Sequence, residues 1–198
     1  EHVPKRGKRP GAAIIEAASA TLISFSVTEQ LIRFLALPIG GLDRLQSIDV
    51  TENVGVFMRV SLLAGFILAL PVIVYQVVAY LMPGLEKNEK RWVLSAIPSA
   101  SILFLAGVAF AYFVMMPSAI PFLTEFLGVN TVPRLSNYID FVTNLLFWIG
   151  ISFESPLLIF LLAKLGFVTA HALLLGWRYA IIIIALVAAV ATPTVDPV

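Results

Sequence analysis

The feature that most constrains this chain is an apolar run too long for the core of a soluble domain. Residues 56–81 read VFMRVSLLAGFILALPVIVYQVVAYL, with Arg59 as the one charge. A helix of about 20 apolar residues crosses the roughly 30 Å of hydrocarbon in a bilayer. The run predicts a membrane-spanning helix. Pro71 predicts a kink rather than a break, because neighbouring helices can satisfy the carbonyl that a proline leaves free.

The rest of the chain shares this apolar character. Of its 198 residues, 60% are hydrophobic and 13% are charged, whereas soluble domains average about 45–50% and about 25%. The sequence therefore predicts an integral membrane protein with an all-α fold, a polytopic bundle of helices. It contains no cysteine, and its two histidines, His2 and His171, are far apart in sequence. We therefore expect no disulfide, no metal site and no cofactor.

Five segments predict membrane spans. The first, 11–27, is the weakest, because Glu16 interrupts it and an acid inside a span is costly. The other four are expected at about 56–81, 92–116, 138–165 and 179–191, the fourth with a bend near Pro156. The remaining segments of this single domain, 1–198, are a basic tail at 1–10, a first cap at 28–55, a charged loop at 83–91 and a second cap at 117–137. We expect the second cap to be irregular, because it contains Pro117, Pro121 and Pro133.

The placement of lysine and arginine predicts the orientation. Nine of the thirteen cations lie in the tail, in the 83–91 loop and in the link at 164–178. These three segments share one side of the membrane if the first segment spans it. Cytoplasmic loops carry an excess of lysine and arginine. We therefore expect a cytoplasmic amino terminus and two extracytoplasmic caps.

Several stretches resemble a known family when they are taken together. They are SLLAGFILALPVIVYQVVAYLMPGLEKNEKR (61–91), LFLAGVAFAYFVMMPSAIPFL (103–123), LSNYIDFV (135–142), GISFESPLLIFLLAKLG (150–166) and ATPTVDPV (191–198). In this order and spacing they resemble TatC, the multispanning core subunit of the twin-arginine protein translocase. The family's amino-terminal signature, H-L-x-E-L-R-x-R-L, is not found in EHVPKRGKRPG, and its sixth span has no counterpart. We therefore expect a fragment or an atypical member of a six-helix family.

The resemblance implies that the 83–91 loop binds signal peptides that carry paired arginines. A guanidinium is matched best by a carboxylate that accepts two parallel hydrogen bonds. Glu89 aligns with the family's acidic position for this motif, and Tyr80 aligns with an aromatic position at the same surface. Glu86 is a second acceptor three residues away. Without the resemblance, both acids would be interpreted as residues that offset the dipole at the start of a helix.

Glu154 interrupts an otherwise apolar stretch, FWIGISFESPLLIF at 147–160. An acid within a span is costly, so it needs a polar partner or a function. The residues alone allow an internal contact or a proton relay; the contact would be with Ser152, Thr143 or Asn144. The resemblance implies a third role, in which Glu154 meets a polar group on single-span partner subunits of the TatA/TatB type.

Other candidates have contact or structural roles. By the resemblance, Thr192 and Asp196 contact a partner subunit, and Pro38 shapes a turn in the first cap. Gly65 and Gly107 predict close approach between helices. No phosphate-binding glycine motif, nucleophile triad or basic aromatic surface is present, so we expect neither an enzyme nor a nucleic-acid-binding protein.

Two functions follow from these observations. By the resemblance, the chain is a translocase subunit of the cell inner membrane. It would bind twin-arginine signal peptides at its cytoplasmic face and scaffold single-span subunits in an oligomeric assembly, which exports folded proteins using the protonmotive force. The alternative is a small secondary transporter with a proton or solute site around Glu154. Such transporters usually show internal repeats, and neither PGLEKNEKR nor FESP recurs in the sequence.

Overall fold

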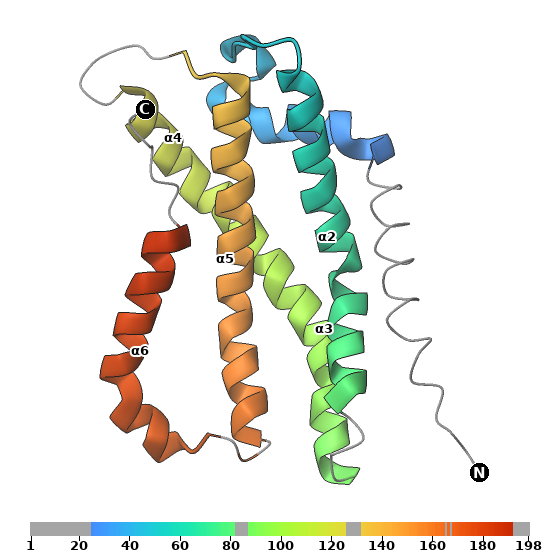
Figure 1. The fold of residues 1–198 in the computed structure, drawn as a ribbon, viewed down its shortest axis with the longest axis vertical. Coiled ribbons are helices and arrows are strands. Elements are labelled where there is room, and N and C mark those ends of the chain that lie inside the picture. Colours follow the sequence, from blue (N-terminus) through green and yellow to red (C-terminus); the bar gives the residue numbers. More distant parts are fainter. Residues whose placement is uncertain (1–24, 82–86, 126–131, 165, 167, 192–198) are drawn as a thin grey trace.

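The computed structural model describes residues 25–81, 87–125, 132–164, 166 and 168–191, and these residues are almost entirely helical. Residues 25–36 form a first helix. The further elements are η1 (Leu37–Ile39), η2 (Leu42–Arg44), α2 (Glu52–Leu81), α3 (Lys87–Phe110), the π-helical turn η4 (Ala111–Met115), α4 (Met116–Glu125), α5 (Leu135–Lys164) and α6 (Ala170–Ala191). The predicted all-α membrane fold is confirmed (Figure 1).

Three of these helices are long and apolar enough to cross a membrane. They cover Glu52–Ala79, Leu94–Glu125 and Leu135–Ala163, and they correspond to the second, third and fourth expected spans. A shorter apolar stretch, Leu175–Leu186, lies in α6. Most of the first expected span, 11–27, lies outside the described residues.

Helix α3 continues without interruption through η4 into α4, although we expected irregular chain from residue 117. The reason lies in the π-helical turn before Pro117. A proline has no N–H to donate and breaks the regular ladder, and here the ladder widens so that the N–H of Met116 donates to the carbonyl of Ala111. The resulting rod, Lys87–Glu125, is roughly 60 Å long at 1.5 Å per residue. It therefore crosses the bundle diagonally (Figure 1).

One further expected boundary differs from the structure. Helix α6 begins at Ala170, although we expected a link up to residue 178. As expected, helices α2 and α5 continue through Pro71 and Pro156 without a break, because their other residues keep the backbone hydrogen bonds of a long apolar helix.

Helices α3 and α5 pack closely at two glycines. A Cβ atom on Gly107 would lie 2.9 Å from Cγ of Phe153 and 3.0 Å from Cα of Gly150. A Cβ atom on Gly150 would lie 2.6 Å from Cε2 of Phe104. The close approach predicted at Gly107 is confirmed, and Gly150 is the partner that the sequence analysis did not single out.

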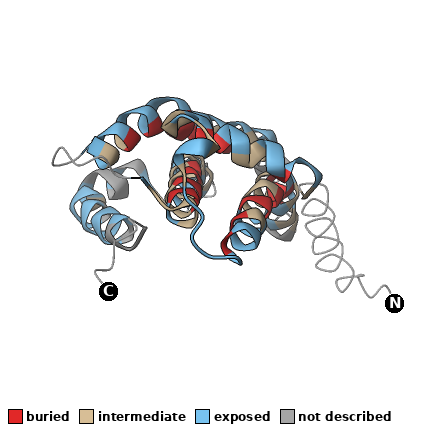
Figure 2. Cartoon of the chain, turned by 90° about the horizontal axis from the view of Figure 1, so that it is seen from above, coloured by how far each residue is buried: buried red, intermediate tan, exposed pale blue. Residues whose placement is uncertain are grey.

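The buried core lies where the first helix, α2, η4 and α5 meet. Its most deeply buried members include Val60, Met116, Ile139 and Val142. Seen from above, the buried positions gather in the middle of the bundle, while α6 lies at one edge and is drawn mainly as exposed or grey (Figure 2). The packed core therefore positions α2, η4 and α5 relative to one another.

Candidate functional site

We call the end of the bundle that contains η1, η2 and the starts of α2 and α5 the capped end. It is held together by one buried carboxylate, Glu52, whose side chain is 1% exposed. Its Oε2 accepts hydrogen bonds from the backbone N–H groups of Ile48 (2.9 Å) and Asp49 (3.3 Å). The same oxygen accepts from Nε of Arg134 at 3.0 Å, and Oε1 accepts from the N–H of Ser136 at 2.6 Å. Glu52 thus satisfies two backbone donors just before α2 and one in the first turn of α5, where the N–H groups have no partner within the helix.

This role of Glu52 was not predicted from the sequence. The available signal was Asp49-x-x-Glu52 before an apolar run, which is the spacing of a capping box. Its connection to Arg134 spans 82 residues of sequence, so no local pattern could have indicated it.

Two tyrosines fix the end of the first helix. The hydroxyl of Tyr112 donates to the carbonyl of Phe34 at 2.7 Å, and that of Tyr138 donates to the carbonyl of Leu35 at 2.8 Å. Carbonyls in the last turn of a helix have no partner within the helix. The tyrosines supply those partners from η4 and α5, so the first helix is held against both.

A second buried contact ties the first helix to α2. The hydroxyls of Thr28 and Ser61 lie 2.7 Å apart, and the rings of Phe25 and Phe57 stack with their centroids 5.6 Å apart. A buried hydroxyl must be hydrogen-bonded to avoid a desolvation cost. These contacts therefore set the position of the first helix along α2.

Arg59 and Asp140 form an ion pair that joins α2 to α5 within the apolar helices. Their side chains are 48% and 42% exposed. Neither this pairing of Arg59 nor a role for Asp140 was predicted from the sequence. Their pairing depends on how α2 and α5 pack, because 81 residues separate them in the sequence.

Glu154 lies in the second half of α5, and its Oε1 is shielded from solvent without a hydrogen-bond partner in the part of the chain that the structure describes. The neighbouring hydroxyls bond to the backbone of their own helix. Ser152 donates to Trp148, Ser155 donates to the carbonyl of Ser152, and Thr143 donates to Ile139. The expected internal contacts with Ser152 and Thr143 are therefore not formed. An unpaired acid within a membrane span requires a partner from elsewhere.

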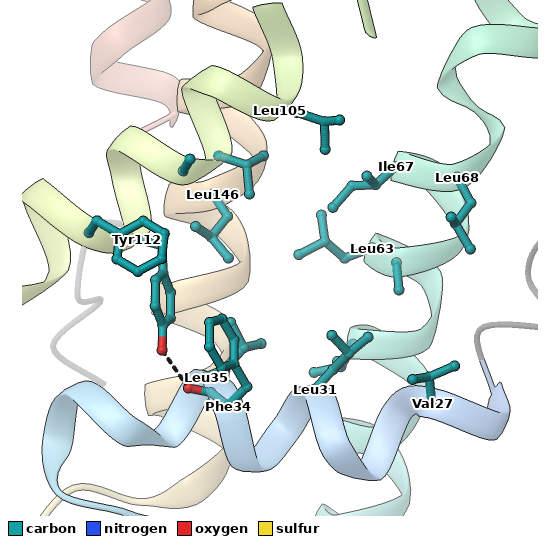
Figure 3. Close-up of a pocket in the computed structure, with 15 residues that line it drawn as sticks. Val27, Leu31, Phe34, Leu35, Leu63, Ile67, Leu68, Leu105, Tyr112 and Leu146 are labelled. Carbon is teal, nitrogen blue, oxygen red and sulfur yellow. Dashed lines mark hydrogen bonds between the residues drawn. The ribbon is translucent and has the colours of Figure 1, made fainter. Parts of the chain in front are cut away.

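A cavity of about 490 Å³ lies between the first helix, α2, the α3–η4 rod and α5. Figure 3 shows Val27, Leu31 and Phe34 lining it from the first helix, and Leu63, Ile67 and Leu68 from α2. The hydroxyl of Tyr112 points away to the carbonyl of Phe34 (Figure 3). With this apolar lining, the cavity suits hydrocarbon and presents no group that would bind a polar solute or carry a proton.

Two of the residues expected to bind signal peptides, Tyr80 and Glu89, have a backbone position at the other end of the bundle from Glu52. Tyr80 is next to the last residue of α2, and Glu89 is in the first turn of α3. The backbone therefore places both at the end where α2 and α3 are joined (Figure 1). For Tyr80 and Glu89 the structure describes the backbone alone, and Glu86, Thr192 and Asp196 lie outside the described residues.

No cluster of three or more histidine, aspartate or glutamate side chains that could hold a metal ion is found within the described ranges. The fold and these sites define a polytopic α-helical membrane protein in which one span, α5, carries an acid without a described partner, Glu154, and also pairs with α2 through Asp140 and Arg59. The chain belongs to the TatC family: the family model described as Sec-independent protein translocase protein (TatC) matches residues 1–198. The resemblance noted from the sequence is thus confirmed.

Individual relatives agree with the family model. A Sec-independent protein translocase protein TatC from Deinococcus radiodurans is 35% identical over 206 residues, which cover 100% of this chain and 76% of the relative. A chloroplastic TATC from Arabidopsis thaliana is 33% identical over 202 residues and is covered to 59% of its length. A crystal structure of a twin-arginine translocase receptor, TatC, superposes with a TM-score of 0.80 at 32% identity, covering 96% of this chain and 86% of that one.

The family assignment settles the class of function. TatC proteins are subunits of a protein translocase in a membrane and are not enzymes. The expectations of a membrane protein engaged in protein transport and of a non-enzymatic subunit are therefore confirmed.

Proposed function

We propose that this protein is the subunit of a twin-arginine translocase that binds signal peptides with paired arginines and scaffolds single-span subunits of the TatA/TatB type. The observation that carries the proposal is the match of the family over the entire chain, together with a solved relative described as a translocase receptor. The export of folded cargo would be driven by the protonmotive force. The secondary-transporter alternative has no such support, and the cavity between the first helix, α2, the α3–η4 rod and α5 offers an almost entirely apolar lining, which does not suit a polar solute.

The signal-peptide site would lie at the cytoplasmic end, on Glu89, Tyr80 and Glu86. A carboxylate at position 89 would accept two parallel hydrogen bonds from a guanidinium, and the ring of Tyr80 would stack on a guanidinium face. Lysine has a compact ammonium that cannot form the same planar pair of bonds. The site should therefore prefer paired arginines to paired lysines.

Photocrosslinking tests this site. A photoreactive residue at position 89 or 80, in membranes, should form adducts with a paired-arginine signal peptide and few with the paired-lysine version. A photoreactive residue at Glu29 is the control, because Glu29 is an exposed acid on the first helix, near the capped end. Equal adducts with both peptides, or adducts at position 29 as strong as those at 89, would contradict the proposal.

The partner contact would involve Glu154, and by the resemblance also Thr192 and Asp196. The buried Oε1 of Glu154 has no described partner, so a polar group on a single-span helix would supply the missing hydrogen bond. Glu154→Gln keeps a donor and an acceptor, whereas Glu154→Ala keeps neither. We expect the glutamine variant to retain co-purifying single-span subunits and the alanine variant to lose most of them. Equal loss in both would indicate instead that titration of the acid itself matters.

The protein would lie in the cell inner membrane with a cytoplasmic amino terminus and with the caps, 28–55 and 117–137, outside. The natural chain contains no cysteine, so single cysteines report their side directly. An impermeant maleimide added outside intact cells should label Asp43→Cys in the first cap and leave Lys5→Cys unlabelled. The opposite pattern would reverse the orientation.

A further inference from the structure

The surface between α2 and α5 carries a polar site that the signal-peptide and Glu154 roles do not use. Arg59 and Asp140 form their half-exposed ion pair there. Beside the pair is a hollow of about 280 Å³, lined from α5 by Thr143, Asn144 and Phe147. Asn144 is exposed, and its amide makes no hydrogen bond with the described residues. On the α2 side of the site, Arg59 is seven positions after the start of the helix, which places it roughly 10 Å along the helix axis.

The hydrogen-bonding capacity of this site is largely unused. A guanidinium has five N–H donors and a carboxylate accepts about four hydrogen bonds, so one ion pair leaves both groups with free positions. The amide of Asn144 adds two donors and an acceptor. In hydrocarbon, such groups cost free energy until a partner satisfies them. The site is therefore complementary to a side chain that both donates and accepts, such as an amide, a hydroxyl or a protonated carboxyl.

The site continues along one face of α5. Asp140, Asn144, Phe147, Ile151 and Glu154 follow one another at steps of four, three, four and three residues. This is the spacing of the seam through which one helix packs against another. The seam has a polar group at each end, about 21 Å apart along the helix axis. On the α2 side, the exposed Leu62 borders the hollow. We call the hollow and the seam on α5 together the groove between α2 and α5.

We propose that this groove between α2 and α5 binds a single membrane-spanning helix of a partner subunit, with a hydrogen-bonding side chain of that helix seated on Arg59, Asp140 and Asn144. The inference rests on the proposed scaffold function and adds a second contact point to the one at Glu154. A helix lying along the seam reaches both polar ends, because 21 Å is about 14 residues of helix. A lipid headgroup satisfies only the end near the cap and leaves Glu154 unpaired.

Disulfide crosslinking tests the groove, since the chain supplies no cysteine of its own. Asn144→Cys and Ile151→Cys are combined with a co-expressed TatA-type subunit that carries one cysteine at a time along its span. Leu105→Cys is the control, because Leu105 is an exposed leucine on α3 that borders the separate apolar cavity. We expect adducts from both groove positions, with the best partner positions about seven residues apart, and none above background from the control.

The outcomes separate this inference from the function on which it rests. Adducts at position 151 without adducts at 144 would leave the Glu154 contact in place and overturn the second contact point. Adducts at neither position, with Glu154→Ala still retaining the partner, would overturn both. Adducts at 105 as strong as those at 144 would show nonspecific collision and also overturn the inference.

A second measurement tests the hydrogen bonds themselves. Asn144→Leu should lower the amount of single-span subunit retained on purification by about three- to tenfold, which is the change in affinity expected when one interhelical hydrogen bond is lost. The control Gln30→Leu, which removes an exposed amide from the first helix, should leave it unchanged. If Asn144→Leu instead removes a bound phospholipid and retains the subunit, the site binds a headgroup and the inference is wrong.

Discussion

The contact between α3 and α5 predicts that Gly150→Ala will destabilise the protein strongly for so small a change. The added Cβ would lie 2.6 Å from Cε2 and 2.7 Å from Cζ of Phe104. The ring of Phe104 cannot retreat easily, because it is 1% exposed and stands edge-on to Phe66 with centroids 5.8 Å apart. The helices must therefore separate, or the ring must leave its preferred rotamer.

The magnitude follows from two opposing effects. Overpacking a well-packed core costs about 1 to 3 kcal/mol, and the rigid surroundings of Phe104 place this site near the upper value. Replacing glycine by alanine inside a helix contributes about 1 kcal/mol in the opposite direction. The net loss should be about 2 kcal/mol, which lowers the thermal midpoint by about 4 to 8 °C for a chain of this size.

Thermal unfolding in detergent measures this loss, with Gly55→Ala as the matched control. A Cβ on Gly55 would meet nothing within 4 Å in helix α2, so this variant should be neutral or slightly stabilised. Phe104→Leu should partly restore Gly150→Ala, because it removes the atoms in the clash. It should not restore Gly107→Ala, whose Cβ meets the backbone of Gly150. Equal midpoints for Gly150→Ala and Gly55→Ala would refute the reasoning.

Two further predictions concern the capped end. Tyr138→Phe removes the buried hydrogen bond to the carbonyl of Leu35 and should cost about 1 kcal/mol of stability. The control Tyr75→Phe, at an exposed position, should cost nothing measurable. Equal thermal midpoints for the two variants would show that the carbonyl of Leu35 finds another donor. Glu52→Gln exchanges an acceptor of four hydrogen bonds for an amide that accepts fewer. Glu52→Gln should lower the thermal midpoint more than Glu29→Gln, which breaks only an exposed ion pair. A larger loss for Glu29→Gln would rule out Glu52 as the link between α2 and α5.

Sequence patterns predicted the spans well where they were strongest. The helices found at Glu52–Leu81 and Leu135–Lys164 lie close to the expected 56–81 and 138–165, because hydrocarbon requires long apolar helices. The prediction was wrong at residues 117–125, where Pro117 and Pro121 indicated irregular chain. A π-helical turn accommodated the first proline instead, and such a turn depends on packing rather than on a local pattern.

Much of the polar chemistry was identified only in part. Glu154 was singled out because an acid in an apolar run is conspicuous at any position of the fold. Its lack of a described partner was not predictable, since the hydroxyls nearby could have faced it or their own helix. Arg59 and Asp140 were each visible as a charge, but their pairing required the register of α2 against α5.

The sequence by itself determined that this protein is a membrane-embedded helical bundle, because the hydrocarbon of the membrane imposes its requirement on each segment separately. A span must be apolar and satisfy its own backbone hydrogen bonds, and both conditions can be seen in consecutive residues. Only the tertiary structure decided which polar groups meet, as Glu52 meets Arg134 and Arg59 meets Asp140. Those pairs join residues about 80 positions apart in the sequence, and their distances depend on how whole helices pack at sites such as Gly107 and Gly150.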